Sequence, residues 1–173
     1  MPRLNTVNPS ETTGRTKEIL EGPLKGMEEK NIFQAMANSP VGLEAYIALG
    51  NATKQGNLSE KEQEIIALAM GEANGCDYCT AAHTAIGQQS GLSEDQTVAA
   101  RKGDTLGDDK LDALREFAMA INEKKGWVTD EDLRNFKNAG YGDAEVVEVI
   151  VNYAKNVYTN TFNHENETEV DFP

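Results

Sequence analysis

The sequence lacks any long apolar run and any surplus of basic residues. Its 173 residues have a mean hydropathy of −0.55 and carry 29 acidic against 16 basic side chains, which gives a net charge of −13. No stretch approaches the ~18 apolar residues of a membrane-spanning helix, so no membrane partner is expected. Because binding of nucleic acid needs clustered Lys and Arg, nucleic acid is not expected as a partner either.

The sequence is also poor in cysteine, and the first residues contain no apolar signal-peptide core. We therefore expect a cytoplasmic protein, in which thiols are kept reduced. The only two cysteines, Cys76 and Cys79, are separated by two residues. A disulfide between them would close a tiny loop and add little stability. Closely spaced cysteines of this kind are more often redox-active or metal-binding.

Strand signals are absent as well, because no segment shows sustained alternation of polar and apolar residues. The predicted fold class is all-α, a single-domain helical bundle. Cap and stop signals, such as the Ser-x-x-Glu capping box at Ser59 and proline after Ser39, mark the helix ends. One helix without clear limits is expected between residues 19 and 37. The other expected helices cover residues around 40–56, 59–74, 76–91, 93–101, 108–121, 129–140 and 143–157.

The expected domain organisation is an extended N-terminal arm over residues 1–16 followed by one helical domain over 17–173. Helical spacing predicts a core stripe, and the apolar residues of the last helix, several of them valines, predict that this helix is buried. The stripe consists of Leu111, Leu114, Phe117 and Ile121. Residues 160–173 form an acidic, polar tail to which no chemistry is assigned, and His164 within it is expected to be structural or exposed.

The chain is organised around the stretch from Glu64 to His83, EIIALAMGEANGCDYCTAAH. Asn74 and Gly75 end one helix, and the next begins with the cysteines in its first turn. Cys76 and Cys79 are then i, i+3 neighbours, while His83 lies one turn beyond Cys79 on the same face. A helix N-terminus and a nearby imidazole both favour the reactive thiolate. The pattern therefore predicts thiol redox chemistry.

Alternatives exist for these residues. Zinc could take Cys76, Cys79, His83 and Glu64 as ligands, although this spacing matches no common structural zinc site. Covalent haem requires histidine directly after the second cysteine, where Thr80 stands. A thioredoxin-like fold is disfavoured because no βαβ pattern surrounds the pair. The spacing alone leaves open which cysteine attacks, since Cys76 is the nearer to the helix start.

The motif formed by Glu64, Cys76, Tyr78, Cys79, Ala82 and His83 resembles the active-site signature of alkyl hydroperoxidase D, within the carboxymuconolactone decarboxylase superfamily. This resemblance implies that Cys79 is the peroxidatic and Cys76 the resolving cysteine. It also implies a proton relay of Glu64 and His83, and Tyr78 could line the site. The ending, with Thr-x-x-Asp-Phe-Pro, is similar to that of peroxidase-related members.

The resemblance implies a peroxidase without cofactor or metal, acting on alkyl hydroperoxides or hydrogen peroxide. Its partner would be a dithiol reductant, in the family prototype a lipoylated protein, and the assembly would be a homotrimer or homohexamer. A carboxymuconolactone decarboxylase-like enzyme is the alternative within the superfamily. The dithiol counts against decarboxylation, because it is characteristic of the peroxidase branch.

Overall fold

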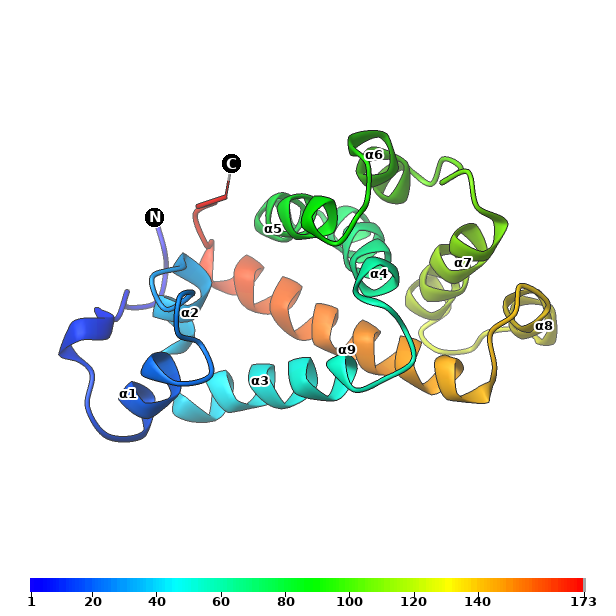
Figure 1. Cartoon of the computed structure of the whole chain (residues 1–173). Helices are drawn as coiled ribbons and strands as arrows, with labels where there is room; N and C mark the ends of the chain where they lie inside the picture. Colours follow the sequence, from blue (N-terminus) through cyan, green and yellow to red (C-terminus); the bar gives the residue numbers. More distant parts are fainter. Residues whose placement is uncertain (173) are drawn as a thin grey trace.

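The computed structural model describes residues 1–172, which form an all-α structure (Figure 1). No strand occurs in this range, and the predicted fold class is confirmed. A 3-10 turn at Pro9–Glu11 precedes nine α-helices in residues 1–172. They are α1 (Gly14–Glu21), α2 (Asn31–Met36), α3 (Pro40–Lys54), α4 (Glu60–Ala73), α5 (Asp77–Gln89), α6 (Glu94–Lys102), α7 (Asp109–Glu123), α8 (Asp130–Asn138) and α9 (Asp143–Asn166).

Helix α4 begins as its sequence predicts. Ser59 Oγ accepts a hydrogen bond from the Glu62 backbone N–H (3.3 Å), and the Glu62 carboxylate accepts one from the Ser59 N–H (2.8 Å). Caps of this type are worth about 1 kcal/mol each. At the other end, Gly75 adopts φ +67°, a left-handed conformation that an L side chain disfavours. This turn places Cys76 directly at the start of α5.

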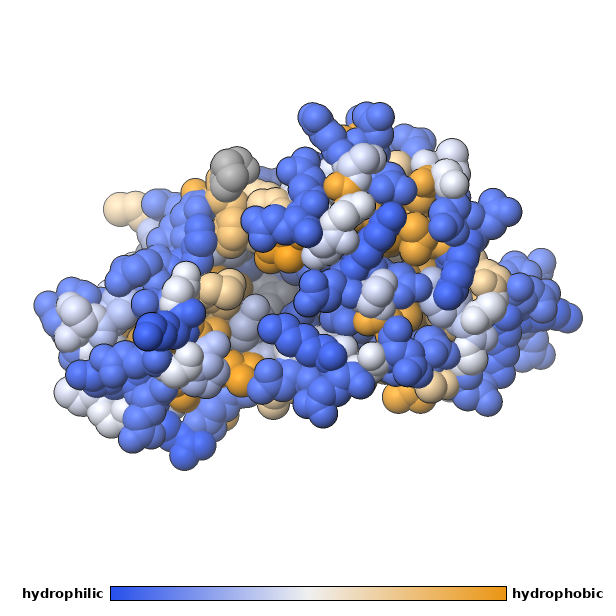
Figure 2. Space-filling model, viewed as in Figure 1, coloured by the Kyte–Doolittle hydropathy of each residue, from blue (hydrophilic) through white to orange (hydrophobic). Residues whose placement is uncertain are grey.

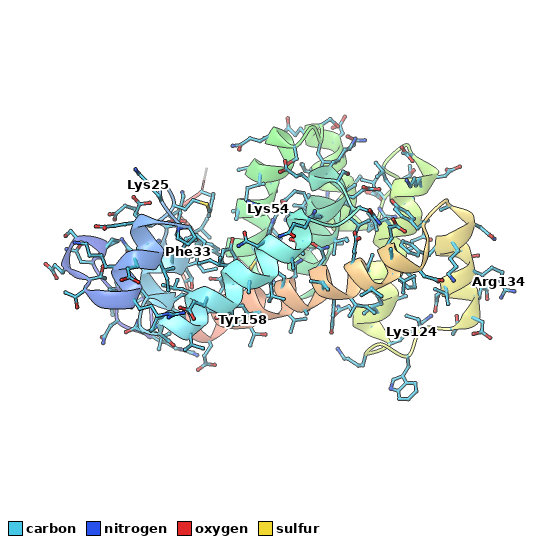
Figure 3. The ribbon with its side chains drawn as sticks, turned by 60° about the horizontal axis from the view of Figure 1, so that its bottom comes forward. Lys25, Phe33, Lys54, Lys124, Arg134 and Tyr158 are labelled. Atoms are coloured by element: carbon cyan, nitrogen blue, oxygen red, sulfur yellow. A yellow bond between two sulfur atoms is a disulfide. The ribbon has the colours of Figure 1, made fainter. Side chains whose placement is uncertain are left out.

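Helix α4 lies at the centre of the fold, where it packs against α5, α6, α7 and α9. The long helix α9 runs through the molecule beside α3, and both chain ends lie near α2 (Figures 1 and 3). The hydroxyl of Tyr158 on α9 donates a hydrogen bond to the Gly42 carbonyl on α3 (3.0 Å). These contacts leave α2, α3, α5 and α9 surrounding one region, in which the candidate site is found.

The predicted apolar stripe on α7 is confirmed as core, with all four of its residues buried. Phe117 of the stripe stacks on Phe136 of α8 at 4.3 Å between ring centroids. Phe136 stacks in turn on Tyr141 at 4.4 Å. Offset aromatic stacking of this kind adds to the free energy gained from burial.

The N-terminal region differs in detail from the sequence-based expectation. One helical segment was expected between Ile19 and Ala37, but α1 and α2 are separate and joined by turns over residues 22–30. Helix α1 already begins at Gly14. The arm before it contacts its own chain, since the Arg3 N–H donates to the Asn166 carbonyl (2.9 Å) and the Val7 N–H to Gln34 (3.1 Å).

Helix α9 departs most from the prediction. Residues 160–166, interpreted as polar tail, continue the helix. Its apolar residues are not all inside, since Val147 is 60% and Ile150 47% exposed. The buried face instead carries mostly polar residues at alternating spacings of three and four. These are Val149, Asn152, Asn156, Thr159, Asn163 and Asn166.

Burial of these amides is tolerated because they form hydrogen bonds. The Asn152 side chain donates to the Glu148 carbonyl (3.0 Å), and Asn156 donates to the Asn152 carbonyl (2.9 Å). A valine-rich pattern therefore predicted the helix correctly but not the face that it buries.

The outer surface is hydrophilic over most of the face seen in Figure 2. Within residues 1–172, none of the helices combines the length and the apolar character needed to cross a membrane. In the same view, hydrophobic residues gather around a recess between α3 and α5 (Figures 1 and 2).

Candidate active site

Two glycines allow α4 and α5 to approach closely at the predicted motif. A Cβ atom on Gly71 of α4 would lie 3.2 Å from Thr80 Cγ2 of α5, which is tighter than an ordinary side-chain contact. A Cβ atom on Gly87 of α5 would lie 3.6 Å from Glu64 Cβ of α4, so the space between these two positions would be filled. The absent side chains thus let Glu64 on α4 reach the face of α5 that carries His83.

Glu64 and His83 form a bonded pair. His83 Nδ1 lies 2.7 Å from Glu64 Oε2, and the two side chains are 16% and 12% exposed. A carboxylate at Nδ1 fixes the tautomer in which Nδ1 carries the proton and Nε2 keeps its lone pair. His83 is therefore arranged to accept a proton at Nε2, with Glu64 stabilising the resulting imidazolium.

The two cysteines are joined in a disulfide, with their Cα atoms 5.2 Å apart. Cys76 is the N-cap residue of α5, and its Sγ accepts a hydrogen bond from the Cys79 backbone N–H (3.3 Å). Both side chains are buried, but only Cys79 lines the cavity described next. A small molecule in the cavity would therefore contact Cys79 and not Cys76.

A cavity of about 50 Å³ lies where α2, α3, α5 and α9 meet. Cys79 and His83 lie in its wall, so the structure brings them to one space. One side is apolar, and Phe33 and Tyr46 within it pack edge to face at 5.0 Å. The other side is polar and comes from α9, through Lys155, Thr159 and Asn163. The cavity therefore suits a small molecule with one apolar and one polar side.

Tyr78 also lines the cavity, as the motif suggested. Its ring packs edge to face on Phe172 at 5.5 Å. Burial, reinforced by the negative charge of Asp171, raises the pKa of the Tyr78 phenol well above its ordinary value. The phenol therefore stays protonated. We assign it a packing role beside the sulfur, because its hydroxyl forms no hydrogen bond within residues 1–172.

The segment after α9 forms part of the same wall, although no pattern in this segment indicated a role in the site. Asp171 Oδ2 accepts a hydrogen bond from the Asn31 backbone N–H at the start of α2 (2.8 Å). Lys30 Nζ lies 4.0 Å from the centre of the Phe172 ring and donates to the Asp171 carbonyl (2.8 Å). These contacts hold Phe172 against the cavity. Pro173 lies outside the described residues.

Asn163 is a site residue that the sequence reasoning missed. Its side-chain Nδ2 donates to Cys79 Sγ at 3.3 Å, and the pair is buried. The two residues are 84 positions apart, and no local pattern connects them. Hydrogen bonds to a charged acceptor are worth more than those to a neutral one, so this amide favours the Cys79 thiolate over the thiol. His164, beside Asn163, is exposed and lies outside the site.

We expect Asn163→Ala to raise the pKa of the reduced Cys79 thiol, because one hydrogen bond to the thiolate is lost. The pH dependence of thiolate absorbance in the reduced protein measures this shift. Asn160→Ala is the matched control, since that buried amide on the same helix accepts from Asn74 (2.9 Å) and not from the sulfur. Equal titration curves for the two variants would contradict the role of Asn163.

The predicted catalytic residues form two bonded pairs beside one cavity, Glu64 with His83 and Cys76 with Cys79. Their catalytic roles stay predictions. For the zinc alternative, no group of three or more His, Cys, Asp or Glu side chains in residues 1–172 is arranged to hold a metal ion. The two sulfurs are bonded to each other in this state. They would act as metal ligands only after reduction.

Comparison with known proteins agrees with the motif. Residues 40–118, which include the whole motif, match the model of the Carboxymuconolactone decarboxylase family. None of the curated proteins matches this sequence.

Solved structures share the fold along nearly the whole chain. The alkylhydroperoxidase AhpD core of Ralstonia eutropha, an uncharacterized peroxidase-related protein, is 21% identical, with a TM-score of 0.86 over 98% of this chain and 92% of that one. A peroxidase-related protein from a Silicibacter species is 18% identical, with a TM-score of 0.81 over 96% and 89%. The debrominase Bmp8, in complex with 2,3,4-tribromopyrrole, is 18% identical, with a TM-score of 0.76 over 99% and 94%.

Proposed function

We propose that this protein is a dithiol peroxidase. The premise is that the chain belongs to the carboxymuconolactone decarboxylase superfamily and has an alkyl hydroperoxidase D-like fold. The substrates would be alkyl hydroperoxides or hydrogen peroxide. One observation carries the proposal. Cys79, which is joined to Cys76 in a disulfide, lines the same cavity as His83, whose Nδ1 is bonded to Glu64.

In the proposed reaction, His83 Nε2 takes the thiol proton of reduced Cys79. The thiolate then attacks the peroxide, so that an S–O bond forms and the O–O bond breaks. The departing alkoxide takes the proton back from the imidazolium and leaves as an alcohol. Cys79 is left as a sulfenic acid. The Cys76 thiol attacks the Cys79 sulfur, water leaves, and the disulfide seen in this structure results.

An external dithiol must reduce the disulfide before the next turnover, and a lipoylated protein is the reductant that we propose. A homotrimer or homohexamer is the proposed assembly. Fold alone does not fix function, so the catalytic assignment depends on the cavity and its residues. The cysteine pair, of which Cys79 lines the cavity, favours redox chemistry over decarboxylation.

We expect the reduced protein to lose two thiols per chain with one equivalent of alkyl hydroperoxide and to gain the Cys76–Cys79 disulfide. Thiol titration and mass spectrometry of the product measure both. The debrominase neighbour makes 2,3,4-tribromopyrrole the comparison substrate. Thiol loss with the bromopyrrole but not with hydroperoxides would overturn the peroxidase proposal. Retention of both thiols with one bound zinc per chain would favour a metal site instead.

A further inference from the structure

Asn163 on α9 has a buried polar atom without a partner. The Nδ2 atom of its amide donates to Cys79 Sγ at 3.3 Å, but its Oδ1 atom accepts no hydrogen bond from any residue in the range 1–172. The residue as a whole is only 4% exposed. Leaving a buried acceptor without a donor is destabilising, so such an atom in a folded protein needs an explanation.

The cavity is the place from which a donor can reach this oxygen, because Asn163 and Cys79 both line it. Oδ1 and Nδ2 belong to one amide, so the unpartnered acceptor lies directly beside the donor that contacts the sulfur. A molecule in the cavity that contacts Cys79 Sγ is therefore also close to Asn163 Oδ1. By contrast, Asn160 has an unpartnered Nδ2 atom on the same helix but does not line the cavity.

The size of the cavity and the chemistry of the oxygen limit what can supply the donor. One water molecule needs at least about 10–15 Å³, so a cavity of about 50 Å³ accommodates a molecule of a few non-hydrogen atoms. A neutral amide oxygen binds an O–H or N–H group and has no hydrogen bond to offer a molecule that lacks one. Hydrogen peroxide meets both conditions.

We propose that Asn163 Oδ1 accepts a hydrogen bond from the terminal O–H of the hydroperoxide and thereby holds the terminal oxygen against Cys79 Sγ. The inference rests on the proposed peroxidase function and names its substrate class as peroxides with a free O–H group. The amide is complementary to two adjacent reacting groups. Its N–H meets the sulfur, which accepts, and its oxygen meets the terminal O–H, which donates.

This arrangement assigns each proton of the reaction. The Cys79 thiolate attacks the terminal oxygen, so an S–O bond forms from the sulfur electron pair and the O–O bond breaks with its pair on the leaving oxygen. The leaving oxygen takes a proton from the His83 imidazolium and departs as water or an alcohol. The terminal oxygen keeps its own proton, which stays bonded to Asn163 Oδ1 in the sulfenic acid. Asn163 itself neither gains nor loses a proton.

The test compares two small molecules that the same thiolate attacks, hydrogen peroxide and methyl iodide, which has no O–H group. Both are given to the reduced protein in the Cys76→Ser background, and mass spectrometry follows the initial rates of sulfenic acid formation and methylation at Cys79. Because both reactions use the thiolate, the peroxide-to-iodide ratio of the rate constants cancels changes in the thiolate itself.

Asn163→Ala is expected to lower this ratio by about 2- to 10-fold, the range for one hydrogen bond between neutral groups. Asn163→Leu, which keeps the volume of the side chain but neither polar atom, should lower the ratio equally. Asn160→Ala is the matched control and should leave the ratio unchanged, because Asn160 lies outside the cavity.

Asn163→Asp separates the acceptor from the donor. It keeps an acceptor oxygen, loses the N–H and adds a negative charge beside the sulfur, which disfavours the thiolate. Both rates should therefore fall, while the peroxide-to-iodide ratio stays at or above the wild-type value. A role of the amide in packing alone would not lower both rates and keep their ratio.

Four results would overturn the inference. They are an unchanged ratio in Asn163→Ala and Asn163→Leu, a fall in only one of them, an equal fall in Asn160→Ala, and a fall in Asn163→Asp as large as in Asn163→Ala. The second would assign the effect to cavity shape, and the last would show that the oxygen is not the acceptor. Circular dichroism checks the folding of each variant. If methyl iodide modifies Cys79 in the Cys76→Ser protein but hydrogen peroxide does not, the proposed function itself has failed.

Discussion

Cys79→Ser is expected to reduce hydroperoxide consumption by roughly 10³- to 10⁶-fold, because the attacking sulfur is lost while the cavity keeps its shape. Cys76→Ser should leave the first chemical step intact. One equivalent of peroxide should then leave a sulfenic acid on Cys79, which dimedone labelling and mass spectrometry detect. The physical reason is the position of the two sulfurs, since Cys79 alone lines the cavity.

The two cysteine variants test the order of attack separately from the function. A sulfenic acid on Cys76 in the Cys79→Ser protein, with none on Cys79 in the reverse variant, would exchange the roles. The peroxidase proposal would survive this result. Loss of sulfenic acid formation in both variants, with both proteins folded, would not be compatible with it.

His83→Phe is expected to slow hydroperoxide reduction at neutral pH by about 10²- to 10⁴-fold, the usual range for general-base assistance. Glu64→Gln keeps the shape but removes the charge that stabilises the imidazolium, so it should slow the reaction less. The two losses should not add in the double variant, since the residues act as one unit through the 2.7 Å contact. Stopped-flow rates of thiol oxidation measure all three.

Raising the pH toward about 8.5, the ordinary cysteine pKa, should partly rescue these variants, because thiolate then forms without a base. The matched control is His164→Phe, which changes an exposed histidine outside the site and should retain the wild-type rate. Full activity of His83→Phe at pH 7 would remove the relay from the mechanism while leaving the dithiol in place.

Local signals in the sequence were sufficient for most of the helices, from α3 to α8, and for the motif. Ser59 and Glu62 form the predicted capping box, and Gly75 ends α4 in the predicted turn. These features depend on residues within one turn of each other, so their pattern is visible in the sequence. The spacing of Cys79 and His83 on one helix face is of the same kind.

Features that depend on distant parts of the chain were not predictable in the same way. Val147 and Ile150 look like core residues, but their side of α9 is not covered by another element in the described chain. Asn163, Lys155 and Phe172 join the cavity only because α9 and the segment after it pack against α2 and α5. The periodicity of one segment does not indicate which other segment packs against it.

The polar face of α9 fixes the register of that helix. Apolar attraction is non-directional, whereas a hydrogen bond requires its partner within a narrow range of distance and angle. Three amides of α9 bond to other parts of the chain: Asn160 to Asn74, Asn163 to Cys79 and Asn166 to the Leu4 N–H. A slip of one turn would break all three bonds and leave buried amides unsatisfied. The register of α9 is thereby fixed relative to Cys79 Sγ, which Asn163 contacts.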